Sequence, residues 1–304
     1  MAEPSNDLPP PTGAERPPSG LTRISERVRR IVAPNPSPFT FTGTCVYIVG
    51  EGEGEVAVID PGPADPAHLD ALLAAIPGES VTRIVVTHSH RDHAGGAALL
   101  QRRTGAPIVG ARAHVVADGK PTRADASHAL DYAPDEALDD GARIAGRGFT
   151  LEAVATPGHA ANHLCFALVE ENALFSGDHV MAWSTSVVAP PDGSMRAYLA
   201  SLEKAARRSE AIYWPGHGGP VRDPQRFVRA LIGHRRQREA AILARLEAGE
   251  ANVAEIVARV YPSLAPALVG AASLSTLAHL ADLIERGLAT SDGAITLEAR
   301  FRRV

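Results

Sequence analysis

Four side chains of the types that bind metal ions lie within six residues of one another: His88, His90, Asp92 and His93. They come directly after an apolar run that ends at Val86, and a glycine pair follows them. A buried strand that ends in such a loop presents its next side chains at the edge of a sheet, where binding sites are common. Imidazole and carboxylate groups suit zinc or iron, and a two-residue spacing lets His88 and His90 point the same way from extended backbone. Taken alone, the cluster also fits a solvated polar loop.

Three further potential ligands, each at the end of its own apolar run, weaken the polar-loop interpretation. They are His159, Asp178 and His217, and a glycine directly precedes each of them. Glycine lets the backbone turn sharply and approach other segments closely, which helps several loops to converge on one point. The sequence therefore predicts that four strand ends bring seven ligand side chains to one metal site.

The pattern before and after this cluster indicates two structural units. The first 38 residues carry too many prolines for a packed helix or a central strand, and we expect residues 1–20 to be disordered. From Phe39, short β-rich runs alternate with helical segments, which predicts sheets covered by helices. A chain of 304 residues exceeds what one hydrophobic core usually holds, so a second unit is expected.

From about Val221 the apolar pattern becomes helical. Helices are expected over Arg235–Leu246, Val253–Tyr261 and Ser273–Leu288, followed by a terminal hairpin with a strand at Ala294–Leu297. Three helices followed by a small hairpin is the order of a winged helix. A stripe of apolar residues on the last helix is predicted to be buried: Leu274, Leu277, Leu280, Leu283 and Ile284.

Composition and charge make several classes of protein poor candidates. Apolar residues make up 45% of the chain, yet no run approaches the roughly 18 uninterrupted apolar residues of a membrane span, so no membrane partner is expected. The net charge of -5 gives no general attraction to nucleic acid, and nine arginines against eight acidic residues from His234 onward make DNA binding unlikely. Cys45 and Cys165 lie in apolar runs that suit buried, reduced thiols. No apolar segment follows a basic start, as it does in a signal peptide, so the cytoplasm is the expected location.

The successive motifs resemble those of the metallo-β-lactamase superfamily: Thr87-His-Ser-His-Arg-Asp-His93, Gly158-His159, Gly177-Asp178 and Gly216-His217. The resemblance spans roughly Pro38 to Pro220. It implies an α/β protein with a four-layer αββα sandwich and metal ions at one edge of its two sheets. Together with the tail, it gives a disordered segment 1–20, a catalytic domain 21–232 and a winged-helix-like domain 233–304.

The resemblance also implies how the ligands divide between two ions. One ion takes His88, His90 and His159, the other takes Asp92, His93 and His217, and Asp178 bridges them. Two zinc ions are favoured, with iron or manganese as alternatives, and such a pair shares one hydroxide that attacks the substrate. Asp92 is expected to orient that hydroxide.

His163 is a further candidate, since it follows His159 by four residues at the start of an apolar strand. It could support a ligand from behind or donate a proton to the leaving group, and the alternative is a hydrogen-bonded structural histidine. Asp92 and His163 are therefore the two catalytic candidates. Two segments after Asp178, residues 184–186 and 190–193, are expected to line the substrate cleft, with an ordinary surface loop as the alternative.

Within the superfamily, the tail most resembles the β-lactamase-like protein 2 group, in which a winged helix follows the hydrolase domain. The residues that carry this resemblance are Tyr213–Pro220, Gly233–Glu239 and Leu280–Gly287. The expected activity is hydrolysis of a small ester, thioester or lactone. The main alternative is a single-strand-specific endoribonuclease with RNA as its partner, and a glyoxalase II-like thioesterase or a DNA-binding regulator is less favoured. The oligomeric state stays open.

Overall fold

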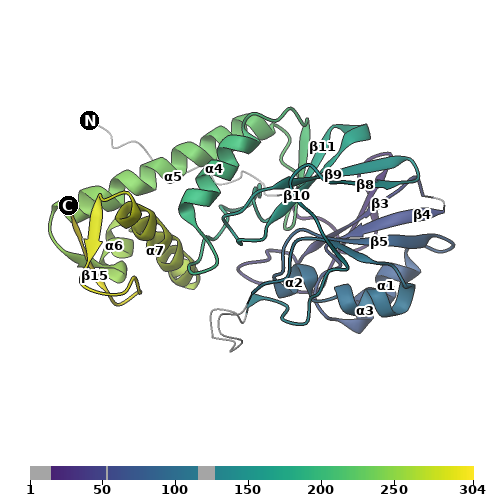
Figure 1. Ribbon diagram of the computed structural model, residues 1–304, viewed down its shortest axis with the longest axis horizontal. Coiled ribbons are helices and arrows are strands. Elements are labelled where there is room, and N and C mark those ends of the chain that lie inside the picture. Colours follow the sequence, from purple (N-terminus) through teal and green to yellow (C-terminus); the bar gives the residue numbers. More distant parts are fainter. Residues whose placement is uncertain (1–14, 53, 116–126) are drawn as a thin grey trace.

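Two β-sheets lie face to face in the larger, N-terminal part of the chain, in a computed structural model that describes residues 15–52, 54–115 and 127–304 (Figure 1). The first sheet has the strand order β1-β2-β3-β4-β5-β6-β7, and the second has the order β12-β11-β10-β9-β8. The strands of the first sheet are Thr22–Arg23, Val28–Val32, Cys45–Val49, Glu55–Ile59, Ser80–Val86, Ile108–Gly110 and Glu136–Ala137 (β1 to β7). Those of the second are Arg143–Gly146, Phe149–Ala155, Leu164–Leu168, Ala173–Gly177 and Ile212–Pro215 (β8 to β12).

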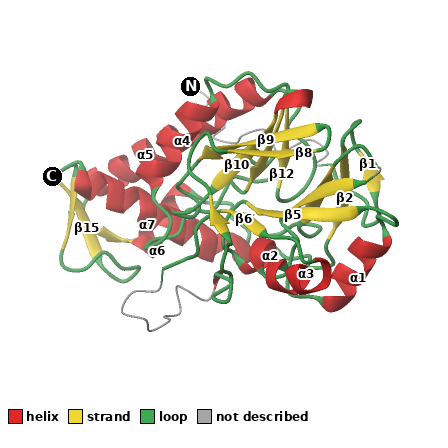
Figure 2. Ribbon diagram, turned by 45° about the vertical axis from the view of Figure 1, so that its right-hand side comes forward, coloured by secondary structure: helices red, strands yellow, loops and turns green. Residues whose placement is uncertain are grey.

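Helices cover the outer face of each sheet. Figure 2 shows α1, α2 and α3 on one side of the pair of sheets and α4 and α5 on the other. Their bounds are Pro66–Ala74, Arg91–Ala94, Ala97–Thr104, Met195–Ala205 and Pro224–Glu247, in that order.

The residues of β3 explain why four layers form. Successive strand side chains point to opposite faces, so a strand buried on both faces needs an unbroken apolar run. Val46 and Ile48 face the helix layer, in one core with Leu72 of α1. Tyr47 faces the other sheet, where its ring centroid lies 5.0 Å from that of Phe175. The predicted αββα sandwich is confirmed.

The N-terminal segment contributes a central strand, contrary to the expectation from its prolines. All five residues of β2 are buried, and Val28 pairs with Val49 of β3. The prolines flank this strand and do not interrupt it, so its backbone N–H groups remain free to donate. Of the segment expected to be disordered, residues 1–14 lie outside the described residues, while Glu15 pairs with Arg222 at 3.1 Å.

The C-terminal part contains α6 (Val253–Val260), α7 (Val269–Glu285) and a small sheet in the order β13-β15-β14. Its strands are Ala251–Asn252, Arg300–Arg303 and Ala289–Ser291, respectively. The terminal hairpin is present, but the strand predicted at Ala294–Leu297 is wrong, because these residues lie in the connection between β14 and β15. The Arg300 backbone N–H donates to Asp292 Oδ1 at 3.0 Å and closes this connection, and Phe301 supplies the buried side chain of the strand.

One helix joins the two parts of the chain. α5 runs without interruption across the expected boundary between residues 232 and 233. Of the apolar stripe that was predicted to be buried, Leu277, Leu280 and Leu283 of α7 fill the core of the C-terminal part, whereas Leu274 and Ile284 are only half-buried. Ala278 of the same helix reaches the core under the second sheet. Among the described helices, Pro266–Glu285 is the one segment long and apolar enough to cross a membrane by length and composition alone, and these leucines are already buried within the protein.

Candidate metal centre

All seven predicted ligand side chains meet at one edge of the two sheets. They come from the loop after β5 and from α2 (His88, His90, Asp92, His93), from the loop between β9 and β10 (His159), and from the ends of β11 and β12 (Asp178, His217). β11 and β12 are parallel neighbours, so their carboxyl ends reach the same edge. The strand ends therefore converge as the apolar runs and glycines predicted.

His88, His90 and His159 form the first group. His90 Nδ1 lies 3.0 Å from His88 Nε2 and 3.0 Å from His159 Nε2, so three ring nitrogens face one point. Burial lowers the pKa of His88 and of His90 well below the usual value, which favours the neutral imidazole that binds metals.

Asp92, His93 and His217 form the second group. His217 Nε2 lies 3.2 Å from both His93 Nε2 and Asp92 Oδ2. Burial opposes protonation, but the carboxylates of Asp92 and Asp178 raise the pKa of His93, and Asp178 raises that of His217 to about 9. Positive charge must therefore balance the carboxylates here, either as protons or as metal cations that replace them.

Asp178 lies between the two groups. Its Oδ1 is 3.4 Å from His93 Nε2 and 3.5 Å from His217 Nε2, whereas its Oδ2 is 3.5 Å from His159 Nε2. The buried Oδ1 makes no hydrogen bond of ordinary geometry with any described residue, although the His93 and His217 rings lie beside it. A buried carboxylate oxygen without a well-formed hydrogen bond is rare in native proteins, and a cation beside it would satisfy it. The donor set thus fits two metal ions that share Asp178.

Asp60 and Thr87 support the second group from behind, a role that was predicted for neither residue, although Thr87 begins the first motif. His93 Nδ1 donates to Asp60 Oδ2 at 2.8 Å, and the backbone N–H and hydroxyl of Thr87 donate to the same carboxylate, each at 2.8 Å. Such a carboxylate fixes the orientation of a metal-binding imidazole and raises its basicity. The available signal was the position of Asp60 directly after the apolar strand β4.

Two other histidines are held by backbone carbonyl groups. His159 Nδ1 donates to Val187 O at 2.6 Å, and His217 Nδ1 donates to Gly43 O at 3.2 Å. With Nδ1 engaged in this way, Nε2 of each ring is the nitrogen left to face an ion.

His163 is buried and has both ring nitrogens in hydrogen bonds. Its Nε2 accepts from the Asp178 backbone N–H at 3.1 Å, and its Nδ1 lies 2.9 Å from Thr156 Oγ1. It therefore contacts the backbone of the bridging aspartate. This geometry favours a positioning role for His163 over proton donation to a leaving group.

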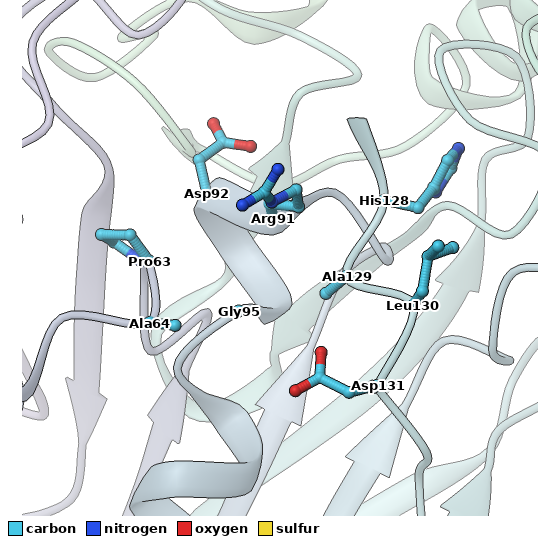
Figure 3. Close-up of a pocket in the computed structure, with 9 residues that line it drawn as sticks. All are labelled: Pro63, Ala64, Arg91, Asp92, Gly95, His128, Ala129, Leu130 and Asp131. Carbon is cyan, nitrogen blue, oxygen red and sulfur yellow. The ribbon is translucent and has the colours of Figure 1, made fainter. Parts of the chain in front are cut away.

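An open pocket of about 730 Å³ begins beside Asp92. Figure 3 shows Arg91 and Asp92 on one side of it and the segment His128–Asp131 on the other. The Asp92 side chain is 29% exposed, more than that of any other ligand in the second group. The pocket therefore reaches the candidate metal centre at Asp92.

Two parts of the chain match known protein families. The profile of the Metallo-beta-lactamase superfamily matches residues 39–217, and that of the Beta-lactamase associated winged helix domain matches residues 253–297. The chain is 31% identical over 187 residues to an atrochrysone carboxyl ACP thioesterase of Aspergillus fumigatus, covering 60% of this chain and 53% of that protein. It is 30% identical over 232 residues to a beta-lactamase-like protein 2 homolog of Caenorhabditis elegans, covering 76% and 74%.

A solved structure has the same fold over nearly the whole chain. It is that of a metallo-beta-lactamase family protein from Thermus thermophilus, with a TM-score of 0.73, 24% identity, and coverage of 93% of this chain and 100% of the other. The winged helix expected from the order of the C-terminal elements is thereby confirmed.

Proposed function

The chain belongs to the metallo-β-lactamase superfamily, and from that premise we propose that it is a hydrolase with two zinc ions that cleaves small-molecule thioesters. The carrying observation is the position of Asp178, which lies between two groups of three ligands and has a buried oxygen that makes no hydrogen bond of ordinary geometry with any described residue. Iron or manganese would suit the same imidazole and carboxylate groups, so the bound metal has to be measured along with activity.

Zinc ions bound by these side chains would supply Lewis acidity and activate a water molecule at neutral pH. The protein's own residues hold the ligands still. Asp60 and Thr87 orient His93, and His163 fixes the backbone of Asp178. Asp92 is the partly exposed carboxylate at the pocket and is placed to orient the attacking water. The reaction adds water across the acyl carbon–sulfur bond and releases a carboxylic acid and a thiol.

A thioester is the favoured substrate class because of the relatives. Both an atrochrysone carboxyl ACP thioesterase and a second fungal protein, a thioesterase of Emericella nidulans with 34% identity over 168 residues, align with this chain. The chain spans 53% and 42% of the length of these two proteins, so only the thioester bond, and no further feature of their substrates, is transferred to this proposal. Small esters and lactones remain secondary substrates of the same site.

An assay of acyl-coenzyme A hydrolysis tests this proposal, with the release of the free thiol as the measured signal. We expect turnover by the zinc-loaded protein, loss of turnover after chelation and recovery when zinc is restored. Asp178→Asn should be inactive, whereas Asp70→Asn, at an exposed position on α1, should match the wild type. Turnover that persists in metal-free protein, or fully loaded protein that hydrolyses no thioester, would contradict the proposal.

Cleavage of single-stranded RNA is the second candidate, and one observation favours it. The open pocket presents the exposed side chain of Arg91, which forms no ion pair with any described residue and could contact a phosphate. Asp131 in the same pocket and the net charge of -5 count against it. Wild-type cleavage of an unstructured oligoribonucleotide that Asp178→Asn lacks would move this candidate ahead.

We also propose a cytoplasmic location and a small molecule as the partner, with neither DNA nor a membrane bound. The two cysteines, Cys45 and Cys165, are buried and unpaired, which suits a reducing compartment.

A further inference from the structure

A second cavity, of about 130 Å³, lies between the segment that follows Asp178 and the C-terminal helices. One wall is residues 183–187, and the opposite wall comes from α5, α7 and the connection between α6 and α7. We call it the interdomain cavity. Most of its lining is apolar, including Phe39, Tyr261, Leu264, Leu268 and Ala271.

Three N–H groups of lining residues are buried and have no acceptor among the described residues: Trp183 Nε1, His234 Nδ1 and Arg235 Nε. The hydrogen bond from Arg238 shows which ring nitrogen of His234 carries the proton. Arg238 Nε donates to His234 Nε2 at 3.2 Å, so this nitrogen is the acceptor and the neutral ring carries its proton on Nδ1. Burial and the charges of Arg235 and Arg238 lower the pKa of His234 to about 4, so the ring is neutral at pH 7.

The described lining of the interdomain cavity carries positive charge without any negative charge. Arg235 is 2% exposed, donates to the backbone carbonyl of Ser186 and lies over the Tyr198 ring, with 5.2 Å between guanidinium carbon and ring centroid. Within the described ranges it has no carboxylate partner, and the described lining contains no aspartate or glutamate. Buried donors and buried charges are normally paired, so the unmet N–H of the Arg235 cation and the two unmet N–H groups of Trp183 and His234 favour an anion with several acceptor positions.

The cavity shares a wall with the metal centre. Ser186 Oγ donates to the Asp178 backbone carbonyl at 2.5 Å, and the Val187 carbonyl accepts from His159 Nδ1 at 2.6 Å. The segment that lines the cavity therefore also fixes two of the proposed metal ligands. A ligand held there would lie one chain segment away from the reacting centre.

We propose that the interdomain cavity binds a carboxylate-bearing apolar group about the size of benzoate, and that this group is the end of the substrate remote from the scissile bond. The second half of the proposal rests on the thioesterase function. The volume of about 130 Å³ limits the enclosed apolar part to one small ring, since an apolar cavity of about 150 Å³ is known to hold benzene. In this proposal the carboxylate lies at the side of the cavity formed by Arg235, His234 and Trp183, and the ring lies at the side formed by Leu264 and Leu268.

Benzoate binding to the zinc-loaded full chain tests the first half without any turnover. The chain has two tryptophans, so protein labelled with ¹⁵N-tryptophan gives two indole signals, and Trp183→Phe assigns them. We expect benzoate to move the Trp183 signal in a saturable way. Benzyl alcohol, which is of similar size but uncharged, should bind at least about tenfold more weakly, because it lacks the charge-assisted hydrogen bonds.

Two variants on α7 locate the binding. Ala271→Leu fills the cavity and should raise the dissociation constant for benzoate at least about tenfold. Ser273→Leu adds similar bulk to the same helix outside the lining and should leave the constant within about twofold. If the Trp183 signal stays fixed, or if Ala271→Leu binds benzoate as the wild type does, benzoate contacts the metal ions only and the proposal is overturned.

A pair of thioesters tests the second half. The kcat/KM for a 4-carboxybenzoyl thioester should exceed that for the benzoyl thioester at least about tenfold in the wild type, and the ratio should fall toward one in Ala271→Leu. Equal kcat/KM values for the two thioesters in the wild type would show that the cavity does not hold the remote end of the substrate, even if benzoate binds there. If neither thioester is hydrolysed, the proposed function fails, and the indole titration still decides whether the cavity binds the anion.

Discussion

Asp60 accepts the Nδ1 proton of His93 at 2.8 Å, and this places His93 Nε2 opposite the carboxylates of Asp92 and Asp178. Asp60 is nearly inaccessible to solvent and has a positive backbone φ of 50°. A non-glycine residue rarely adopts this conformation, so the surrounding structure must hold it. Its position at the end of β4 lets one carboxylate join that strand to the loop after β5 and to α2.

Asp60→Asn should weaken the second metal position. The neutral amide is a weaker acceptor for the His93 ring, and loss of such a partner typically costs about 10- to 100-fold in metal affinity. Competition with a chelator of known affinity measures this change, and Asp70→Asn, which is exposed, is the matched control. Wild-type affinity at both positions in Asp60→Asn would show that Asp60 does not support a ligand.

Gly177→Ala should disturb the candidate metal centre, and its effect should exceed the cost of placing alanine in a left-handed backbone conformation. A Cβ at Gly177 would lie 2.6 Å from His163 Nε2, the atom that holds the Asp178 backbone. Gly105 also has a positive φ, of 73°, but a Cβ there meets nothing within 4 Å. Gly105→Ala should therefore lower the free energy of unfolding, measured with urea, by only about 1–2 kcal/mol, which is the cost of a left-handed conformation for a residue with a Cβ.

Gly177→Ala should lose more stability than this control and should also lose bound metal, as measured by elemental analysis. Equal losses of stability in the two variants, with full metal content in both, would mean that His163 does not position Asp178.

His279→Leu should make the protein less sensitive to acid. His279 is fully buried, and both of its ring nitrogens lack partners among the described residues. Burial, with the charges of Arg235, His234, Arg238 and Arg286, lowers its pKa to about 3. The unfolded chain, with a histidine pKa of about 6.5, therefore binds a proton that the folded chain excludes.

Stability should accordingly fall in the wild type as the pH drops below about 6.5. The difference in unfolding free energy between His279→Leu and wild type should widen by about 2 kcal/mol between pH 6.5 and 4.5. Chemical unfolding at several pH values measures it. A difference that is the same at both ends of this range would show that His279 titrates normally in the folded protein.

The seven candidate ligands could be identified from the sequence because each lies in a recognisable local pattern. They are imidazole or carboxylate residues that follow apolar runs, and His159, Asp178 and His217 each follow a glycine. Asp60 also follows an apolar strand, but it stands alone and no glycine precedes it. Its role depends on contacts with Thr87 and His93 that exist only after β4 and β5 pair.

The two errors in the fold have the same kind of cause, since tertiary contacts override local composition. Prolines near β2 suggested irregular chain, but pairing with β3 and burial between two layers make Val28–Val32 a central strand. Ile295 and Leu297 have β-forming side chains, yet both are more than a third exposed. Phe301 has the buried position, so the register of the hairpin follows Phe301.

Anomalous diffraction above the zinc absorption edge, from crystals of protein loaded with zinc, tests the central claim most directly. We expect two peaks about 3.5–4 Å apart, one beside His88, His90 and His159 and the other beside Asp92, His93 and His217, with Asp178 between them. A single peak, peaks away from these side chains, or no peak at all would contradict the assignment of a two-metal hydrolase.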